Sequence, residues 1–345
     1  MAVTRFQFEE ACASGALLVE DWCEGFLALI SDPEASNRDV LAATRAAGRS
    51  LAPSERQRWL DDLVEFALWE SGRQPGRLAL CDHVVRSGLA PFDPPWRWRS
   101  GPVGGLLHIA CEGASYEGVL WALRRGPRTI LRRGGSLGVS VAHTLANRSR
   151  GEEAARIWGL LRAHGARADA LTDDGRSALF RCDDPELASE LMRGGADPWL
   201  TDARGFAAGS FWLESGNWDC ARLAFEAAPW RLDAPIPWGE ISSARSARPP
   251  LFDRPLFVAA CSPALRMARG RAGSSQTDIL EELVRMGADP LALDSEGRSL
   301  HQRSANPVAL ALQERSALAA AARKPRRRSA RRARAPEQPS APRRL

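Results

Sequence analysis

The side chains able to take part in acid–base, nucleophilic or metal chemistry are few and far apart. The chain of 345 residues has five histidines and seven cysteines. His108 and Cys111 are one helical turn apart, which suits a pair of metal ligands, but no second ligand pair accompanies them. The adjacent carboxylates Asp173 and Asp174 could act as general acid and base, yet they fall in a predicted turn, where solvated acids are common. The sequence therefore predicts neither a metal site nor a catalytic carboxylate pair.

Other signatures of catalysis are absent from the sequence. It contains no Gly-x-Ser-x-Gly nucleophile elbow, no phosphate-binding glycine loop and no HExxH metal helix. The cysteines are odd in number, form no CxxC pair and fall mostly in apolar helical runs, so we expect reduced thiols in the core. We predict a protein that is not an enzyme and that uses no catalytic residues, no metal and no cofactor.

The distribution of apolar residues bears on the compartment. No stretch of about eighteen uncharged apolar residues is present, so we predict no membrane span. The first twenty-odd residues include Glu9, Glu10, Glu20 and Asp21, where a secretory signal would need a basic start and an apolar run. These features predict a cytoplasmic protein, with secretion into a host or nuclear targeting as alternatives.

Two segments of the chain repeat one design. Residues 186–205 align without a gap on residues 278–297. Each copy begins as a short amphipathic helix, ends at a glycine and runs into a Gly-Ala-Asp-Pro turn and a second glycine. A helix of about ten residues is not stable alone, so each copy must stack on a neighbour of its own kind. The shared positions are Glu190/Glu282, Leu191/Leu283, Arg193/Arg285, Gly195/Gly287, Ala196/Ala288, Asp197/Asp289, Pro198/Pro290, Asp202/Asp294 and Gly205/Gly297.

Residues 106–113 and 119–126 carry the clearest single unit. They read Leu-Leu-His-Ile-Ala-Cys-Glu-Gly and Val-Leu-Trp-Ala-Leu-Arg-Arg-Gly. This unit resembles the ankyrin repeat pattern Pro-Leu-His-x-Ala-Ala-x-x-Gly followed by Val-Val-x-Leu-Leu-x-x-Gly. The resemblance recurs with drift over roughly residues 75–315, and the helix-ending positions lie 30 to 39 residues apart except for a last interval of 59. It implies an all-α, ankyrin-type helical-repeat solenoid with short hairpin loops, a helical N-terminal cap and a disordered C-terminal tail.

The chain divides into three predicted parts. Residues 1–74 form a helical N-terminal capping region or degenerate repeats. Residues 75–322 form the ankyrin-like repeat domain, with loop insertions near 235–255 and 266–276 that explain the long interval. Residues 323–345 form a disordered Arg-rich tail, since they contain almost no apolar residue besides alanine.

The resemblance also implies roles for particular polar residues. A serine or threonine at the start of the first helix, and a histidine shortly after it, tie one turn to the next in this family. Ser177, His108 and His143 match those places, and His301 is a further match in a shifted register. The histidine place is taken by Phe180, Ser210 and Phe257 in other units, where we expect the tie to be lost or replaced by packing.

Repeat domains of this kind bind proteins through a concave face and hairpin tips, so the resemblance implies an unidentified protein partner and a monomeric chain. For Trp199 the alternative to partner contact is packing against an adjacent hairpin. The predicted contact residues are Thr172, Asp173, Trp199, Leu200, Thr201, Ala203, Arg204, Leu293, Ser295 and Glu296.

The C-terminal tail is strongly basic. Residues 323–345 carry a net +9 against +5 for the whole chain, which leaves −4 on residues 1–322. Such a tail could contact nucleic acid non-specifically, an import receptor or an acidic membrane surface, or simply aid solubility. It has no aromatic residue, which argues against single-strand stacking. The basic residues predicted to make such a contact are Arg323, Lys324, Arg326, Arg327, Arg328, Arg331, Arg332 and Arg334.

Two functions follow from these features. The first is a protein–protein interaction scaffold, which in a bacterial setting could be a host-directed effector. The second is a nucleic-acid-associated adaptor anchored by the Arg-rich tail. Lys324 is the only lysine in the chain, which fits GC-rich codon usage and also fits selection against lysine modification inside a host.

Overall fold

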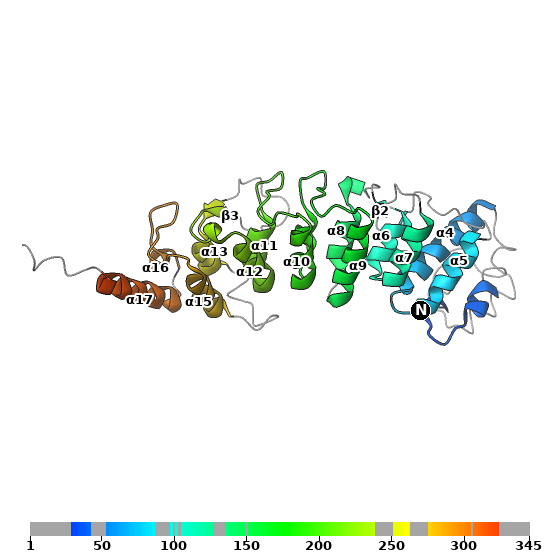
Figure 1. The fold of residues 1–345 in the computed structure, drawn as a ribbon, viewed down its shortest axis with the longest axis horizontal. Coiled ribbons are helices and arrows are strands. Elements are labelled where there is room, and N and C mark those ends of the chain that lie inside the picture. The colour runs from blue at the N-terminus through cyan, green and yellow to red at the C-terminus, as the bar shows by residue number, and fades with distance from the viewer. Residues whose placement is uncertain are drawn as a thin grey trace, which may run out of the picture.

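A computed structural model describes residues 29–42, 53–86, 97–98, 101–102, 105–126, 131, 136–148, 151–238, 251–262, 275–304 and 306–323. These residues are mostly helical, and the helices stand side by side along one long axis (Figure 1). The sheets in this part of the chain are two short antiparallel hairpins. The predicted all-α helical-repeat solenoid with short hairpin loops is confirmed.

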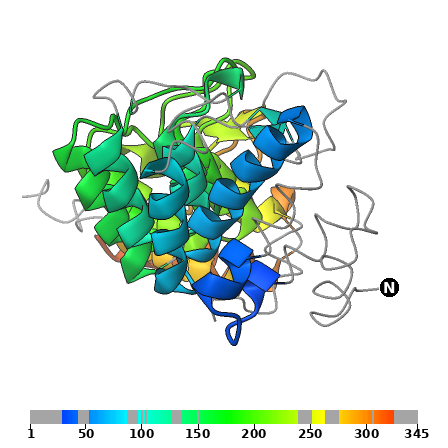
Figure 2. The ribbon, with the colours of Figure 1, turned by 90° about the vertical axis from the view of Figure 1, so that its right-hand side faces the viewer.

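The first helices of successive units form an inner row. Each member packs on the next, so the row is continuous along the molecule. Seen along the long axis, the helices overlie one another and the hairpin loops gather at one edge (Figure 2). The row consists of α4 (Pro53–Glu70), α6 (Leu106–Glu112), α8 (Val141–Arg148), η4 (Ala178–Arg181), α11 (Ala208–Ser215), α13 (Pro255–Cys261) and α16 (Leu300–Arg303).

The second helices form an outer row behind the first. The 3₁₀ turn η5 (Pro229–Leu232) packs on both α12 and α15 and so continues the row between them. The outer helices are α5 (Leu78–Arg86), α7 (Tyr116–Arg125), α9 (Glu152–Ala163), α10 (Pro185–Arg193), α12 (Trp218–Ala227), α15 (Gln276–Met286) and α17 (Pro307–Arg323).

The remaining described elements are short. The 3₁₀ turn η1 (Pro75–Arg77) precedes α5, and η3 (Ser136–Gly138) precedes α8. The strand pairs are β1 (Arg97–Trp98) with β2 (Gly101–Pro102), and β3 (Ile236–Trp238) with β4 (Leu251–Asp253). The second pair lies inside the first predicted loop insertion, of which residues 239–250 fall outside the described residues.

The core lies between the two rows. Trp158, Trp212, Phe225 and Phe257 are its largest fully buried side chains. Both indole N–H groups donate to backbone carbonyls of a neighbouring unit. Trp212 Nε1 donates to Cys182 O of the preceding unit at 2.7 Å, and Trp158 Nε1 donates to Glu190 O of the following unit at 3.3 Å. Large aromatic residues can therefore fill the core of each unit without leaving a polar atom unpaired.

The described cysteines are free thiols, and all but Cys261 are buried. Burial raises the pKa of the Cys182 thiol to about 12, and it also raises the pKa of Cys81, Cys111 and Cys220. A thiol that stays protonated is a poor nucleophile, so these side chains act as small core residues. Cys12 and Cys23 lie outside the described residues.

Two local differences from the sequence pattern stand out. The inner element of the unit that ends with α10 is one 3₁₀ turn, η4, instead of a two-turn helix. The last helix, α17, runs to Arg323, the first residue of the predicted disordered tail, because residues 316–322 are mostly alanine, the best helix former.

The ends of the chain are only partly described. Residues 1–28 and 43–52 lie outside the described residues, and so does the tail beyond Arg323. The predicted boundary at residues 74 and 75 falls between α4 and α5, which pack against each other at the head of the two rows. Residues 29–42 are held there by Arg77, which donates to Asp32 O at 2.7 Å and Asn37 Oδ1 at 3.1 Å.

Candidate functional site

Three hairpin loops project from the inner row, and we call residues 171–177, 201–207 and 293–299 the fingers. In each, a backbone N–H pairs with the carbonyl four residues on: Thr172 N with Arg176 O at 2.9 Å, Asp202 N with Phe206 O at 2.8 Å, and Asp294 N with Arg298 O at 2.9 Å. Each finger turns at a glycine with positive φ, at Gly175, Gly205 and Gly297. Only glycine adopts this conformation without strain, which is why the repeat keeps it.

A buried polar side chain holds each finger in shape. Asp202 Oδ1 accepts the N–H groups of Arg204 at 2.9 Å and Phe206 at 3.0 Å. Asp294 Oδ1 accepts those of Glu296 and Arg298 at 2.9 and 2.7 Å.

Thr172 takes the same place in the first finger, where its hydroxyl accepts the N–H of Arg176 at 3.1 Å and donates to the Asp174 carboxylate. Its side chain is buried. The prediction that Thr172 contacts a partner is therefore corrected, because its hydroxyl is used to build the turn.

Neighbouring fingers are joined by backbone hydrogen bonds. Asp173 N donates to Leu137 O at 3.0 Å, and Ala203 N donates to Asp174 O at 2.8 Å. The turn η3 and the first two fingers thus form one continuous row at the edge where the loops gather (Figure 1). The row is a preformed surface whose shape is set by the scaffold.

Trp199 is buried. Its indole Nε1 donates to Ala224 O at 3.2 Å, its ring centroid lies 5.1 Å from that of Phe225, and the guanidinium of Arg231 covers the ring at 5.5 Å. Only 7% of the residue is exposed. Trp199 thus packs against α12 and η5, which leaves little of its side chain for the predicted contact with a partner.

The other predicted contact residues lie at the surface, on the fingers or, for Leu200, immediately before the second finger. Leu200 is 40% exposed and Leu293 is 52% exposed. Glu296 pairs with Arg298 at 2.6 Å, whereas the guanidinium of Arg204 has no ion pair among the described residues. The exposed members are Asp173, Leu200, Thr201, Ala203, Arg204, Leu293, Ser295 and Glu296.

The sequence did not single out three exposed apolar residues along the same edge. Leu137 in η3 is 72% exposed, Leu171 at the start of the first finger is 43% exposed, and Phe252 in β4 is 51% exposed. An apolar residue beside a turn glycine, as at Leu137 and Gly138, was an available signal. Phe211 on α11 adds a further exposed ring on the inner row.

Two histidines tie successive units together. His108 Nε2 donates to Val139 O at 3.2 Å, and His143 Nε2 donates to Arg176 O at 2.9 Å. The second ring nitrogen of His143 lies 2.8 Å from the Ser140 hydroxyl. Burial lowers the pKa of His108 to about 4 and also lowers the pKa of His143, so both rings are neutral at pH 7. The predicted structural role of these histidines is confirmed.

Ser177, Ser210 and His301 do not tie successive units together. The Ser177 hydroxyl is buried without a hydrogen-bond partner, so its predicted tie is wrong. Ser140 pairs with His143 three residues later, but the residue three places after Ser177 is Phe180, which offers no hydrogen-bond partner. Ser210 likewise has no partner for its hydroxyl, as expected for a lost tie, and His301 is exposed and not buried between turns.

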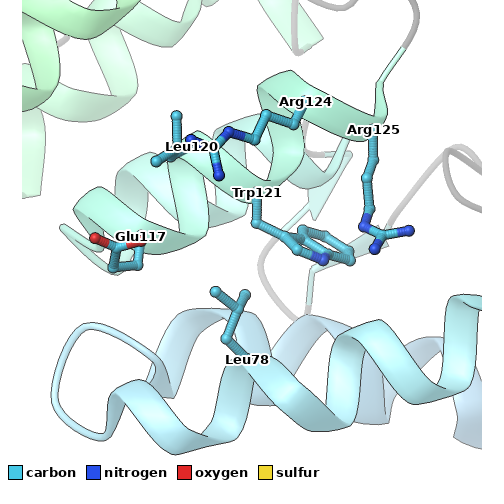
Figure 3. Close-up of a pocket in the computed structure, with 6 residues that line it drawn as sticks. All are labelled: Leu78, Glu117, Leu120, Trp121, Arg124 and Arg125. Atoms are coloured by element: carbon cyan, nitrogen blue, oxygen red, sulfur yellow. The ribbon is translucent and has the colours of Figure 1, made fainter.

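A pocket of about 420 Å³ lies on the outer side, between α5 and α7. Figure 3 shows Trp121 and Arg125 on α7 above Leu78, with Glu117, Leu120 and Arg124 along the same helix. Two of the lining residues, Trp121 and Arg125, contact Asp82 on α5, which accepts Trp121 Nε1 at 3.0 Å and pairs with Arg125 and with Arg86. No nucleophile or histidine lines it, and this arrangement suits packing more than catalysis.

Two further observations concern metals and membranes. In the part of the chain that the structure describes, no group of three or more His, Cys, Asp or Glu side chains could hold a metal ion. Over the same residues, every helix is too short or too polar to span a bilayer. Of the basic tail, Arg323 ends α17 and the remaining residues lie outside the described ranges.

Paired helix rows, glycine-turned fingers and histidine ties between units define an ankyrin-like helical-repeat protein.

No protein-family model and no curated protein matches the chain. Among solved structures, it is similar to the crystal structure of EF0377, an ankyrin repeat protein: identity is 16% and the TM-score is 0.43, over 61% of this chain and 96% of that one. It is also similar to a chain in the structure of the predatory endopeptidase Bd0816 from Bdellovibrio bacteriovorus in complex with the immunity protein Bd3460, at 16% identity and a TM-score of 0.40, over 64% of this chain and all of that one.

Proposed function

We propose that this protein is a protein–protein interaction scaffold that binds a protein partner through its fingers and the adjoining inner row. The observation that carries the proposal is the set of exposed apolar side chains at and beside the fingers: Leu137, Leu171, Leu200 and Leu293. Single exposed leucines are ordinary, but several exposed apolar residues at one edge of a molecule suggest an interaction surface.

The chemistry of the described polar groups supports binding over catalysis. His108 and His143 are buried, neutral and committed to backbone carbonyls. The carboxylates of Asp202 and Asp294 are committed to finger N–H groups. These groups make a rigid frame, and a rigid frame reduces the entropy that is lost when a partner binds.

Affinity capture from the native cell tests the proposal. The double substitution Leu171→Ser with Leu200→Ser removes one exposed leucine at the start of the first finger and one immediately before the second. Leu318→Ser on α17 is a matched control because Leu318 is 71% exposed. We expect the wild type and the control to retain the same protein by mass spectrometry, and the double variant to lose it. Retention by a folded double variant would contradict a role for the fingers.

A host-directed effector is the narrower form of this proposal. It is supported by the presence of a single lysine, Lys324, which leaves few sites for host lysine modification. A reporter fused to the chain and assayed inside host cells tests it, and a reporter that never leaves the bacterium would contradict it. Codon usage would then account for the scarcity of lysine.

A further inference from the structure

An exposed indole and an unpaired guanidinium lie together on the turn η5, outside the fingers. Trp230 is 65% exposed, although a tryptophan ring is the largest apolar side chain. The guanidinium carbon of Arg231 lies 4.2 Å from the centroid of that ring. Tryptophan and arginine are enriched among the residues that contribute most to binding at protein interfaces. The pair is therefore a candidate anchor for a partner.

The scaffold holds the Arg231 side chain in place. Its guanidinium contacts a second indole, the buried ring of Trp199, at 5.5 Å from the centroid. The turn itself packs on α12, α13 and α15 and buries Leu232. An arginine that is already ordered in this way loses little conformational freedom when it binds an anion.

Arg231 has no acidic partner among the described residues. Its Nε is buried without a hydrogen-bond acceptor. The nearest acid in the sequence, Asp233, instead accepts the N–H of Asp289 at 2.8 Å. A charged donor that is removed from water without an acceptor costs free energy, and a carboxylate from outside the chain would offset this cost. Part of the residue is exposed, so such a carboxylate can reach the guanidinium.

We propose that Trp230 and Arg231 anchor an acidic segment of a protein partner. A carboxylate of the segment pairs with the guanidinium of Arg231, and a proline or aliphatic side chain next to it packs on the exposed part of the Trp230 indole. A nucleic acid could offer a phosphate and a base to the same pair. However, residues 1–322 carry a net charge of −4, which suits a segment with isolated acids better than a polyanion.

Fluorine NMR of the full-length protein tests this contact. Labelling with fluorotryptophan gives each of the twelve tryptophans a signal, and the signal that is lost in Trp230→Phe belongs to Trp230. A local signal is needed because the Arg-rich tail also attracts acidic peptides. The probe is a peptide of about four Leu-Glu-Pro units. The control ligands are a Leu-Arg-Pro peptide of reversed charge, a Ser-Glu-Ser peptide without apolar residues, and single-stranded oligothymidylate.

We expect the Leu-Glu-Pro peptide to shift the Trp230 signal and to bind about tenfold more tightly than either control peptide. Arg231→Gln should weaken this binding about tenfold. Arg204→Gln is the matched control, because it removes another arginine without an ion pair among the described residues, and it should change binding by no more than about twofold. Unchanged signals of Trp158 and Trp212 in both variants would show that the core is intact.

A Trp230 signal that does not move with the Leu-Glu-Pro peptide would overturn the proposal, and so would equal effects of Arg231→Gln and Arg204→Gln. Tighter binding of oligothymidylate at this signal would assign the pair to nucleic acid and would also overturn it. If the probe fails while capture of a native partner still depends on Leu171 and Leu200, this anchor is wrong and the scaffold function stands. If the probe binds as expected and that capture fails, the anchor stands and the role of the fingers is wrong.

Discussion

The guanidinium Nε of Arg176 lies 2.9 Å from the buried Oδ2 of Asp202, and this contact joins the first finger to the second. The same carboxylate accepts two backbone N–H groups of its own finger through Oδ1. Asp202 therefore links the shape of one finger to the position of the next.

Replacement of Asp202 by alanine should cost about 2 kcal/mol of unfolding free energy, because two N–H groups and one guanidinium lose their acceptor. Chemical denaturation measures this change. Asp173→Ala is the control on the neighbouring finger, and it should change stability by less than about 0.5 kcal/mol because Asp173 is exposed. Equal effects of the two substitutions would contradict the role given to Asp202.

His108 should make the fold sensitive to acid. Its pKa falls from 6.5 in the unfolded chain to about 4 in the folded protein because the ring is buried. Between these values the unfolded state binds more protons than the folded state. The stabilisation that the neutral His108 ring gives the fold is therefore fully present above pH 6.5 and is lost as pH falls toward 4. The loss should be about 3 kcal/mol, measured from denaturation midpoints across this range. His108→Gln should flatten the pH dependence, and an unchanged slope would count against the assignment.

Asp253 should have the opposite effect on how stability depends on pH. Its buried Oδ2 has no hydrogen-bond partner, and burial, with Asp294 nearby, raises the pKa of its carboxyl above the usual value of 3.8. The folded state then holds a proton that the unfolded state releases, so stability falls as pH rises through this range. Asp253→Asn should raise the melting temperature at pH 7 and have little effect near pH 3. A variant that is less stable than the wild type at pH 7 would show that the charge is compensated.

Gly209 on α11 should not tolerate a side chain. A Cβ at this position would lie 2.9 Å from the ring of Trp199, which is held by Phe225 and Ala224. Gly209→Ala should therefore destabilise the fold by about 1 to 3 kcal/mol. Gly159→Ala on α9 is the matched substitution in open space, and it should stabilise by about 0.5 to 1 kcal/mol. If both substitutions stabilise, the close packing of Trp199 is wrong.

Deletion of residues 323–345 separates the two functions that follow from the sequence. It removes a segment of net +9. We expect any retention on DNA or RNA to fall away at moderate salt with the deletion, while partner capture through the fingers persists. Nucleic-acid retention that survives the deletion would contradict a tail-driven contact.

Sequence reasoning identifies features that are repeated and local. The glycines of the fingers, the ties made by His108 and His143, and the helix pairs follow from residue type and period alone. The exposure of a single side chain depends instead on its neighbour in the next unit. Trp199 is buried because Phe225 and Arg231 come against it, and its counterpart Leu291 is 41% exposed. Leu171 remains at the surface for the same kind of reason, which no pattern within its own repeat reveals.

The four-residue turn η4 shortens the inner row between α8 and α11. Its neighbours in the inner row, α8 and α11, are each eight residues long. Across this thin place the units are also held by His143 to Arg176, by Asp173 to Leu137 and by Ala203 to Asp174. A ligand that binds the first two fingers would therefore add contacts across the short inner element η4.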